Sequence, residues 1–194
     1  METIIQLDKI WFLYVNNTLS NPFFDWLCPL LRNQKTWYLF YVAIIYFFYK
    51  NYKNNTWKIL LVIALMIVVS DQFSANLVKK TFMRIRPCSE PSLHGMVKHL
   101  IASCNGYSFI SAHATNHFAL ALFFIFYFKH YGKWVIFIAL FWAFSIAFSQ
   151  VYVGVHYPLD VIVGAMVGSL FGTAFARYSL KFIKLSNFKN TLNL

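Results

Sequence analysis

The chain has 194 residues, of which 59% are hydrophobic, 21% aromatic and only 12% charged, and its formal net charge is +11. A soluble domain of this length needs more polar residues to cover its exterior, so we expect a membrane protein. Nucleic-acid binding is disfavoured, because the cations are divided between separate loops instead of forming one stripe.

Two short amphipathic segments come first, within residues 1–34. The first has apolar side chains at near-helical spacing, and Asn21-Pro22 is a helix-start signal for the second. Both are rich in aromatic residues and too short to span, so we expect interfacial helices. A sixth spanning helix is the alternative, but polar residues interrupt this region at Asp8, Asn16, Asn17 and Asp25. We expect no signal peptide, because Glu2 and Asp8 replace the usual basic start.

Five apolar stretches follow and predict five spanning helices. They lie at residues 37–49, 59–78, 118–128, 134–148 and 161–176. The predicted fold class is therefore all-α, a polytopic membrane helix bundle of five transmembrane helices, or six if the N-terminal segment also crosses. We expect one membrane-embedded domain over residues 1–194, with its catalytic core at residues 55–180.

Basic residues in alternate loops predict the orientation. Nine cations lie in two of these loops and in the C-terminal tail, at Lys50, Lys53, Lys58, Lys129, Lys133, Arg177, Lys181, Lys184 and Lys189. No acidic residue accompanies them, so the positive-inside rule places these loops and the C-terminus in the cytoplasm. With an odd number of spans, the N-terminus and the loops described next lie outside.

Three clusters of reactive side chains adjoin the ends of the apolar stretches. Lys79 and Arg86-Pro87 follow the second stretch, Ser111-Ala112-His113 opens the third, and residues 149–160 connect the fourth and fifth. Together they supply cations, helix-start amides, two histidines and a carboxylate. These groups are suited to holding and splitting a phosphate ester.

The first cluster is basic. Lys79 and Arg86 are seven residues apart, so two helical turns would place them on one face if the second spanning helix continues that far. Lys80 and Arg84 add positive charge. The alternative is a juxtamembrane cluster that only attracts lipid headgroups.

The second cluster starts a helix. The free amides at Ser111 and Ala112 form an anion cradle with the serine hydroxyl, and His113 is the candidate general acid. His117 lies one turn further along. A His-x3-His pair can bind zinc, but no acidic third ligand is near in sequence, so we predict no metal and give His117 an orienting or packing role.

The third cluster contains His156 and Asp160, one helical turn apart. The carboxylate can therefore hold one ring nitrogen and leave the other free to attack. A structural histidine–aspartate pair that caps the last span is the alternative.

In these residues the chain resembles the type 2 phosphatidic acid phosphatase (PAP2) family, whose pattern is K-x6-RP, PSGH and SR-x5-H-x3-D. The first element matches completely from Lys79 to Pro87. In the second, Ile110 and Ala112 replace Pro and Gly. In the third, Gln150 replaces Arg.

The resemblance implies a metal-independent membrane lipid phosphatase without a cofactor. By that resemblance His156 is the nucleophile that forms a phosphohistidine, Asp160 orients it, and His113 acts as acid and then base. Lys79, Arg86, Ser111, Ala112 and Gln150 would bind the phosphate.

The resemblance also implies a substrate and a location. In bacterial relatives of this size we expect undecaprenyl diphosphate to be converted to undecaprenyl phosphate at the outer face of the cytoplasmic (inner) membrane. Phosphatidylglycerophosphate, phosphatidate and lipid A phosphates are the alternatives. The expected partners are the bilayer and its lipid substrate, with the chain as monomer or homodimer.

Gln150 is the main departure from the pattern, because it donates hydrogen bonds but carries no charge. Losing a charge-assisted contact costs on the order of 1.5–3 kcal/mol. Lys80 or Arg84 could compensate, and we expect Gln150→Arg to keep or raise turnover. Two other classes stay open: a degenerate protein that only binds phospholipid headgroups, and a vanadate-dependent haloperoxidase, which the apolar spans disfavour.

Other residues suggest supporting roles. Asp71 lies in the second span and should pair within the bundle, with Lys79, Arg86 or a histidine as partner. Small residues on the last span, at Gly164, Gly168 and Gly172, form a ridge for close helix packing or for homodimerisation.

Cys88 and Cys104 bracket an irregular outer loop. A disulfide is permitted on the extracytoplasmic side, and it would contribute roughly 3 kcal/mol in the chain-entropy model. The sequence leaves their pairing open, and Cys28 would remain free.

Overall fold

The computed structural model describes residues 2–102 and 104–183, and every regular element in those ranges is helical. The all-α prediction is therefore confirmed. The α-helices are α1 (Glu2–Leu13), α2 (Pro22–Arg32), α3 (Tyr38–Tyr52), α4 (Thr56–Gln72), α5 (Lys79–Phe82), α6 (Ala112–Phe128), α7 (Lys133–Tyr152) and α8 (Pro158–Phe182).

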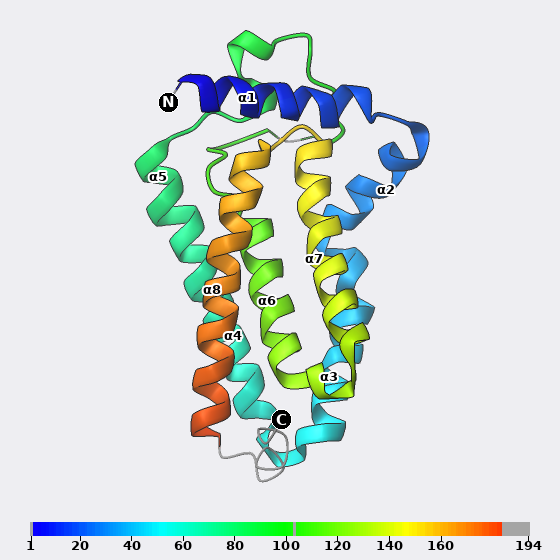
Figure 1. Ribbon diagram of the computed structural model, residues 1–194, viewed down its shortest axis with the longest axis vertical. Coiled ribbons are helices and arrows are strands. Elements are labelled where there is room, and N and C mark those ends of the chain that lie inside the picture. Colours follow the sequence, from blue (N-terminus) through cyan, green and yellow to red (C-terminus); the bar gives the residue numbers. More distant parts are fainter. Residues whose placement is uncertain (1, 103, 184–194) are drawn as a thin grey trace.

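The long helices form a bundle, and α1 lies across one end of it (Figure 1). Helix α6 is the most buried, and it packs against both α7 and α8. The transverse position of α1 matches the expected interfacial helix. Helix α2 instead slopes into the bundle and packs along α7, so only the first N-terminal segment lies across the end (Figure 1).

Three helical stretches are long and apolar enough to cross a membrane: Gln34–Leu93, Lys133–Tyr152 and Pro158–Phe182. The first of these contains both α3 and α4, and α6 is an apolar helix of 17 residues. The number of spans therefore stays a prediction. The orientation also stays a prediction, since Lys184 and Lys189 lie outside the described residues.

The second predicted span ends earlier than the sequence suggested. Helix α4 passes through a π-helical turn (Phe73–Val78) into the short α5, and Met83 then adopts a left-handed conformation with φ 44°. A non-glycine residue in this region does not continue a right-handed helix. Arg86 is extended, with φ −72° and ψ 151°. Lys79 and Arg86 therefore do not share a helical face, and that part of the prediction is wrong.

Glycines bring α8 against α6. A Cβ atom at Gly168 would lie 2.1 Å from the Thr115 carbonyl oxygen, and one at Gly172 would lie 2.3 Å from the Ala119 carbonyl oxygen. Only glycine permits this approach, because any side chain would overlap the backbone of α6. The ridge thus packs within the bundle, and it sets how closely the second and third clusters meet.

Candidate active site

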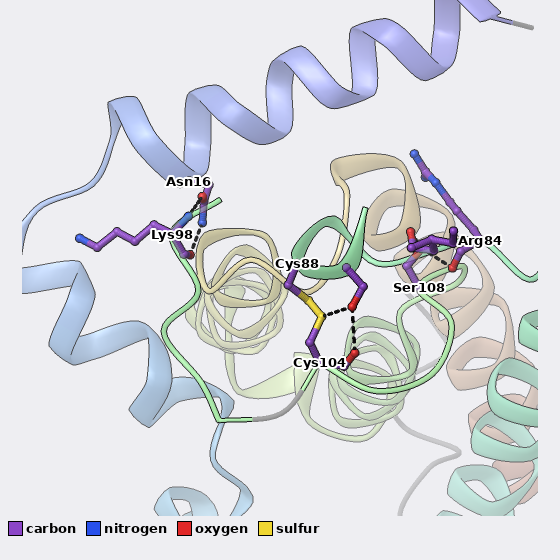
Figure 2. The surroundings of a disulfide bond; sticks show 8 residues. Asn16, Arg84, Cys88, Lys98, Cys104 and Ser108 are labelled. Atoms are coloured by element: carbon purple, nitrogen blue, oxygen red, sulfur yellow. Dashed lines mark hydrogen bonds between the residues drawn. A yellow bond between two sulfur atoms is a disulfide. The ribbon is translucent and has the colours of Figure 1, made fainter. Parts of the chain in front are cut away.

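Hydrogen bonds bring the three sequence clusters together at the α1 end of the bundle. The Ser111 amide donates to the Asp160 carbonyl oxygen at 3.0 Å, which joins the second cluster to the third. The Arg84 Nη1 donates to Asp160 Oδ1 at 2.7 Å, which joins the first. The Ser108 amide also donates to the Arg84 carbonyl oxygen at 2.8 Å (Figure 2). Residues from three parts of the chain therefore form one site.

His156 and Asp160 form the buried centre of this site. Asp160 Oδ2 accepts a hydrogen bond from the Tyr157 amide at 2.8 Å and lies 3.5 Å from His156 Nδ1. The two side chains are 0% and 3% exposed for Asp160 and His156, respectively. The carboxylate faces Nδ1, which leaves Nε2 as the nitrogen available for attack. Burial lowers the pKa of His156 to about 4, so the imidazole is neutral and nucleophilic at pH 7.

Arg84 is engaged by two carboxylates. Besides Asp160, its guanidinium binds Asp8 Oδ2 at 2.6 Å and lies 3.9 Å from the centre of the Tyr157 ring. The other Asp8 oxygen accepts from the Leu159 amide at 2.8 Å. Burial raises the pKa of Asp8, and the Leu159 amide and Arg84 oppose that rise. Arg84 therefore links α1 to Asp160, in contrast to the accessory phosphate-binding role considered from the sequence.

The second cluster starts α6 as predicted. Ser111 is the N-cap, and its hydroxyl accepts from the Ala114 amide at 3.4 Å. His113 lies in the first turn, where the helix N-terminus favours an anion. His117 Nδ1 donates to the His113 carbonyl oxygen at 2.7 Å, and its ring packs edge-on against Trp142. These contacts fit the packing role expected for His117.

Two buried donors in the site lack a partner in the described part of the chain. They are Arg86 Nε and Gln150 Nε2, and both belong to residues expected to bind phosphate. Leaving a buried donor unpaired costs about 1–3 kcal/mol, and an anion with several acceptor oxygens would satisfy both. The donor chemistry therefore fits a phosphate group. Lys79 is partly buried near this site, whereas Lys80 is exposed.

Arg32 is a neighbour of the site that the sequence did not reveal. It lies in the last turn of α2, and its Nε donates to Gln150 Oε1 at 3.1 Å. A basic residue at a helix C-terminus is common, so nothing in the local pattern distinguishes it. Asp8 was also missed, because its polar character was taken only as an interruption of an apolar segment.

Asp71 has a different partner from those predicted. Asn116 Nδ2 of α6 donates to Asp71 Oδ1 at 3.4 Å, and the Ser70 hydroxyl donates to Asn116 Oδ1. This polar contact joins α4 to α6 inside the bundle. The bundle-packing role is retained, with an asparagine in place of a cation or a histidine.

The outer loop is closed by a disulfide between Cys88 and Cys104, whose Cα atoms are 6.2 Å apart (Figure 2). The Ser89 hydroxyl donates to the Cys104 carbonyl oxygen at 3.3 Å. Cys28 is free and buried. Among the described residues, the one group of clustered metal-ligand types is Cys88, His99 and Cys104, and the disulfide occupies two of its three ligands.

Two curated proteins resemble the chain in sequence. A protein named lipid A 4'-phosphatase from Porphyromonas gingivalis is 34% identical over 125 residues, which cover 63% of this chain and 52% of that protein. A protein of the same name from Bacteroides thetaiotaomicron is 29% identical over 151 residues, covering 75% of this chain and 64% of its own length. The chain thus spans about half to two thirds of the length of these relatives.

Two solved structures share the fold. The crystal structure of LpxE from Aquifex aeolicus matches with a TM-score of 0.66 and 26% identity, over 89% of this chain and 96% of that one. A PAP2-type phosphatidylglycerolphosphate phosphatase from Bacillus subtilis matches with a TM-score of 0.72 over 94% and 89% of the two chains. Its 20% identity shows the fold alone.

The family assignment agrees with the geometry. Residues 55–184, more than half of the chain, match the PAP2 superfamily, and they include all three clusters that meet at Asp160. The resemblance noted in the sequence is thereby confirmed, and the chain belongs to the PAP2 superfamily.

Proposed function

We propose that the protein is a membrane lipid phosphatase that hydrolyses a phosphate monoester through a phosphohistidine. The observation that supports this most strongly is the buried His156–Asp160 pair beside two unpartnered donors, Arg86 Nε and Gln150 Nε2. The pair supplies a neutral nucleophile, and the donors suit the phosphate oxygens.

The proposed reaction has two steps. His156 Nε2 attacks phosphorus, the bond between phosphorus and the lipid oxygen breaks, and His113 gives its proton to the departing alcohol. Water then attacks the phosphohistidine while His113 takes its proton, and the P–N bond breaks to release phosphate. Lys79, Arg86 and the amides at the start of α6 stabilise the charge in both steps.

The relatives favour a lipid A phosphate as the substrate. Both curated proteins carry the name lipid A 4'-phosphatase, so we propose this glycolipid class ahead of undecaprenyl diphosphate, the substrate expected from the sequence. Phosphatidylglycerophosphate is the second candidate, through the Bacillus subtilis structure.

A pocket supports entry of a lipid from the side of the bundle. It has a volume of about 350 Å³ and is lined by residues of α3, α4 and α6, including the exposed Tyr38 and Ile45. Asn116 and His117, one turn from His113, also line it. An acyl chain there would remain among apolar side chains while its headgroup reaches the site. A larger groove of about 730 Å³ between α7 and α8 contains none of the candidate catalytic residues.

The site is proposed to face the extracytoplasmic side of a bacterial inner membrane. The cations Lys50, Lys53 and Lys58 lie at the α3–α4 end of the bundle, away from the site, and the positive-inside rule places such loops in the cytoplasm. The disulfide of the outer loop suits an oxidising compartment.

The test is phosphate release by the purified protein in detergent with EDTA. The substrates are lipid A, phosphatidylglycerophosphate, phosphatidate and undecaprenyl diphosphate. We expect EDTA-resistant release, fastest from lipid A, that is lost in His156→Ala and retained in His130→Ala, an exposed histidine at the other end of α6.

Two results would contradict the proposal. Release that survives His156→Ala would rule out the histidine mechanism. No release from any lipid by folded protein that still binds these lipids would favour the headgroup-binding alternative.

A further inference from the structure

Position 150 carries a neutral side chain where the family pattern has an arginine, yet the structure places a guanidinium beside it. Gln150 is completely buried, and its Oε1 accepts a hydrogen bond from Arg32 Nε at 3.1 Å. Arg32 comes from α2, 118 positions earlier in the chain and outside the region that matches the family.

We infer that Arg32 supplies the phosphate-binding cation that the third cluster lacks, and that Gln150 positions it. This inference rests on the proposed function and names a further phosphate-binding residue. Gln150 and Arg32 together would then perform the task of one arginine: the amide donates one hydrogen bond, and the guanidinium brings the charge.

The unused donors of the pair support this role. With Oε1 bound to Arg32, Gln150 Nε2 is buried and unpartnered, and Arg32 makes no hydrogen bond through Nη1 or Nη2 within the described residues. An arginine held through Nε keeps its two terminal nitrogens free for an acceptor, and phosphate oxygens match that fork.

The charge of Arg32 reaches the other cations of the site. Burial and then Arg32 lower the pKa of Arg86, and the same two causes lower the pKa of His99 in the outer loop. Cations do not gather in a partly buried space without an anion, because their repulsion destabilises the folded state. A bound phosphate would offset this repulsion.

The end of α2 is fixed in place, as a binding residue requires. Trp37 Nε1 donates to the Leu31 carbonyl oxygen at 2.8 Å, directly before Arg32, and the Trp37 ring packs against Trp142 of α7. At the start of α2, Asp25 binds both Lys98 and the Tyr152 hydroxyl. Arg32 is thus carried on a helix anchored at both ends.

The cations considered from the sequence are less suitable. Arg84 is bound by Asp8 and Asp160, and Lys80 is exposed. The contact with Arg32 also changes the expectation for Gln150→Arg. Alone, this substitution replaces the acceptor that holds Arg32 with a second guanidinium, so we expect a gain in turnover only when Arg32 is replaced as well.

The test compares Arg32→Gln, the double variant Arg32→Gln/Gln150→Arg and the control Lys35→Gln. Lys35 is an exposed cation three residues further along, and its side chain makes no hydrogen bond. Turnover of lipid A is measured together with the affinity for inorganic phosphate, obtained by calorimetry on the detergent-solubilised protein.

We expect Arg32→Gln to lower kcat/KM and phosphate affinity by roughly 10- to 100-fold, which is the size of one lost charge-assisted contact. Lys35→Gln should match the wild type, and the double variant should recover most of the loss. Recovery separates a phosphate contact from a packing role, because an arginine at position 150 does not restore packing at the end of α2.

Two outcomes would overturn the inference. One is wild-type phosphate affinity in Arg32→Gln; the other is a folded double variant with no recovery. The affinity measurement does not depend on turnover. A wild type that binds phosphate through Arg32 but releases none from lipids would refute the proposed function and leave the inference standing.

Discussion

At the scale of single residues, the site is organised around the Asp160 carboxylate. One oxygen binds Arg84, and the other accepts from the Tyr157 amide and faces His156. Arg84 in turn binds Asp8 of α1. The position of the nucleophile therefore depends on a residue more than 150 positions away in sequence.

Asp8→Asn tests this dependence. The variant removes one of the two anions that hold Arg84, so Asp160 loses part of its support. We expect kcat to fall roughly tenfold with little change in KM, because small displacements of catalytic groups slow chemistry more than binding. The measurement is steady-state lipid phosphatase kinetics.

The matched control for that variant is Glu2→Gln, which neutralises an exposed carboxylate on the same helix. It should behave as the wild type. A loss of thermal stability in Asp8→Asn with unchanged kcat would instead assign Asp8 to the attachment of α1 alone.

At the scale of the elements, the approach of α8 to α6 sets the distance between the second and third clusters. Gly164, Gly168 and Gly172 all face the α6 backbone. The Ser111–Asp160 hydrogen bond lies at the same interface, so the packing of these two helices and the geometry of the site are coupled.

Alanine substitutions at these glycines should therefore destabilise the fold. A Cβ would lie 2.1 Å from the α6 backbone at position 168, against 2.8 Å at position 164. Overpacking of this kind costs about 1–3 kcal/mol, so we expect Gly168→Ala to lower the Tm more than Gly164→Ala does.

Thermal unfolding in detergent measures both variants, with Leu170→Ala as the control because Leu170 is 71% exposed. A Gly168→Ala protein with the wild-type Tm would show that α8 can move away from α6 at no cost.

At the scale of the whole molecule, α1 and the disulfide-closed outer loop cover one end of the bundle (Figure 1). The Lys9–Glu90 ion pair at 3.1 Å joins them. Asn16 also donates to the Lys98 carbonyl oxygen at 2.9 Å and accepts from the Lys98 amide at 2.8 Å (Figure 2). These contacts link the N-terminal segment to the loop above the site.

The orientation of this end is testable by cysteine labelling. In a background without native cysteines, Met96→Cys reports on the outer loop and Asn54→Cys on the α3–α4 connection; both positions are exposed. A membrane-impermeant maleimide applied to spheroplasts should label position 96 only. Labelling of position 54 alone would reverse the topology drawn from the positive-inside rule.

The sequence by itself determined the membrane class, the all-α fold and the three clusters. These follow from apolar stretches, from Ser111 and Pro158 at helix starts, and from the short His156–Asp160 spacing. All are properties of contiguous residues, so local preferences are enough to predict them.

The tertiary structure decided which cations serve which role. It ended α5 at Phe82, assigned Arg84 to Asp8 and Asp160, and placed Arg32 on Gln150. Such contacts join residues that are distant in sequence, and their energies depend on burial and geometry that only the packed bundle provides. That is why the motif showed Gln150 as a missing charge, and only the fold showed a neighbouring one.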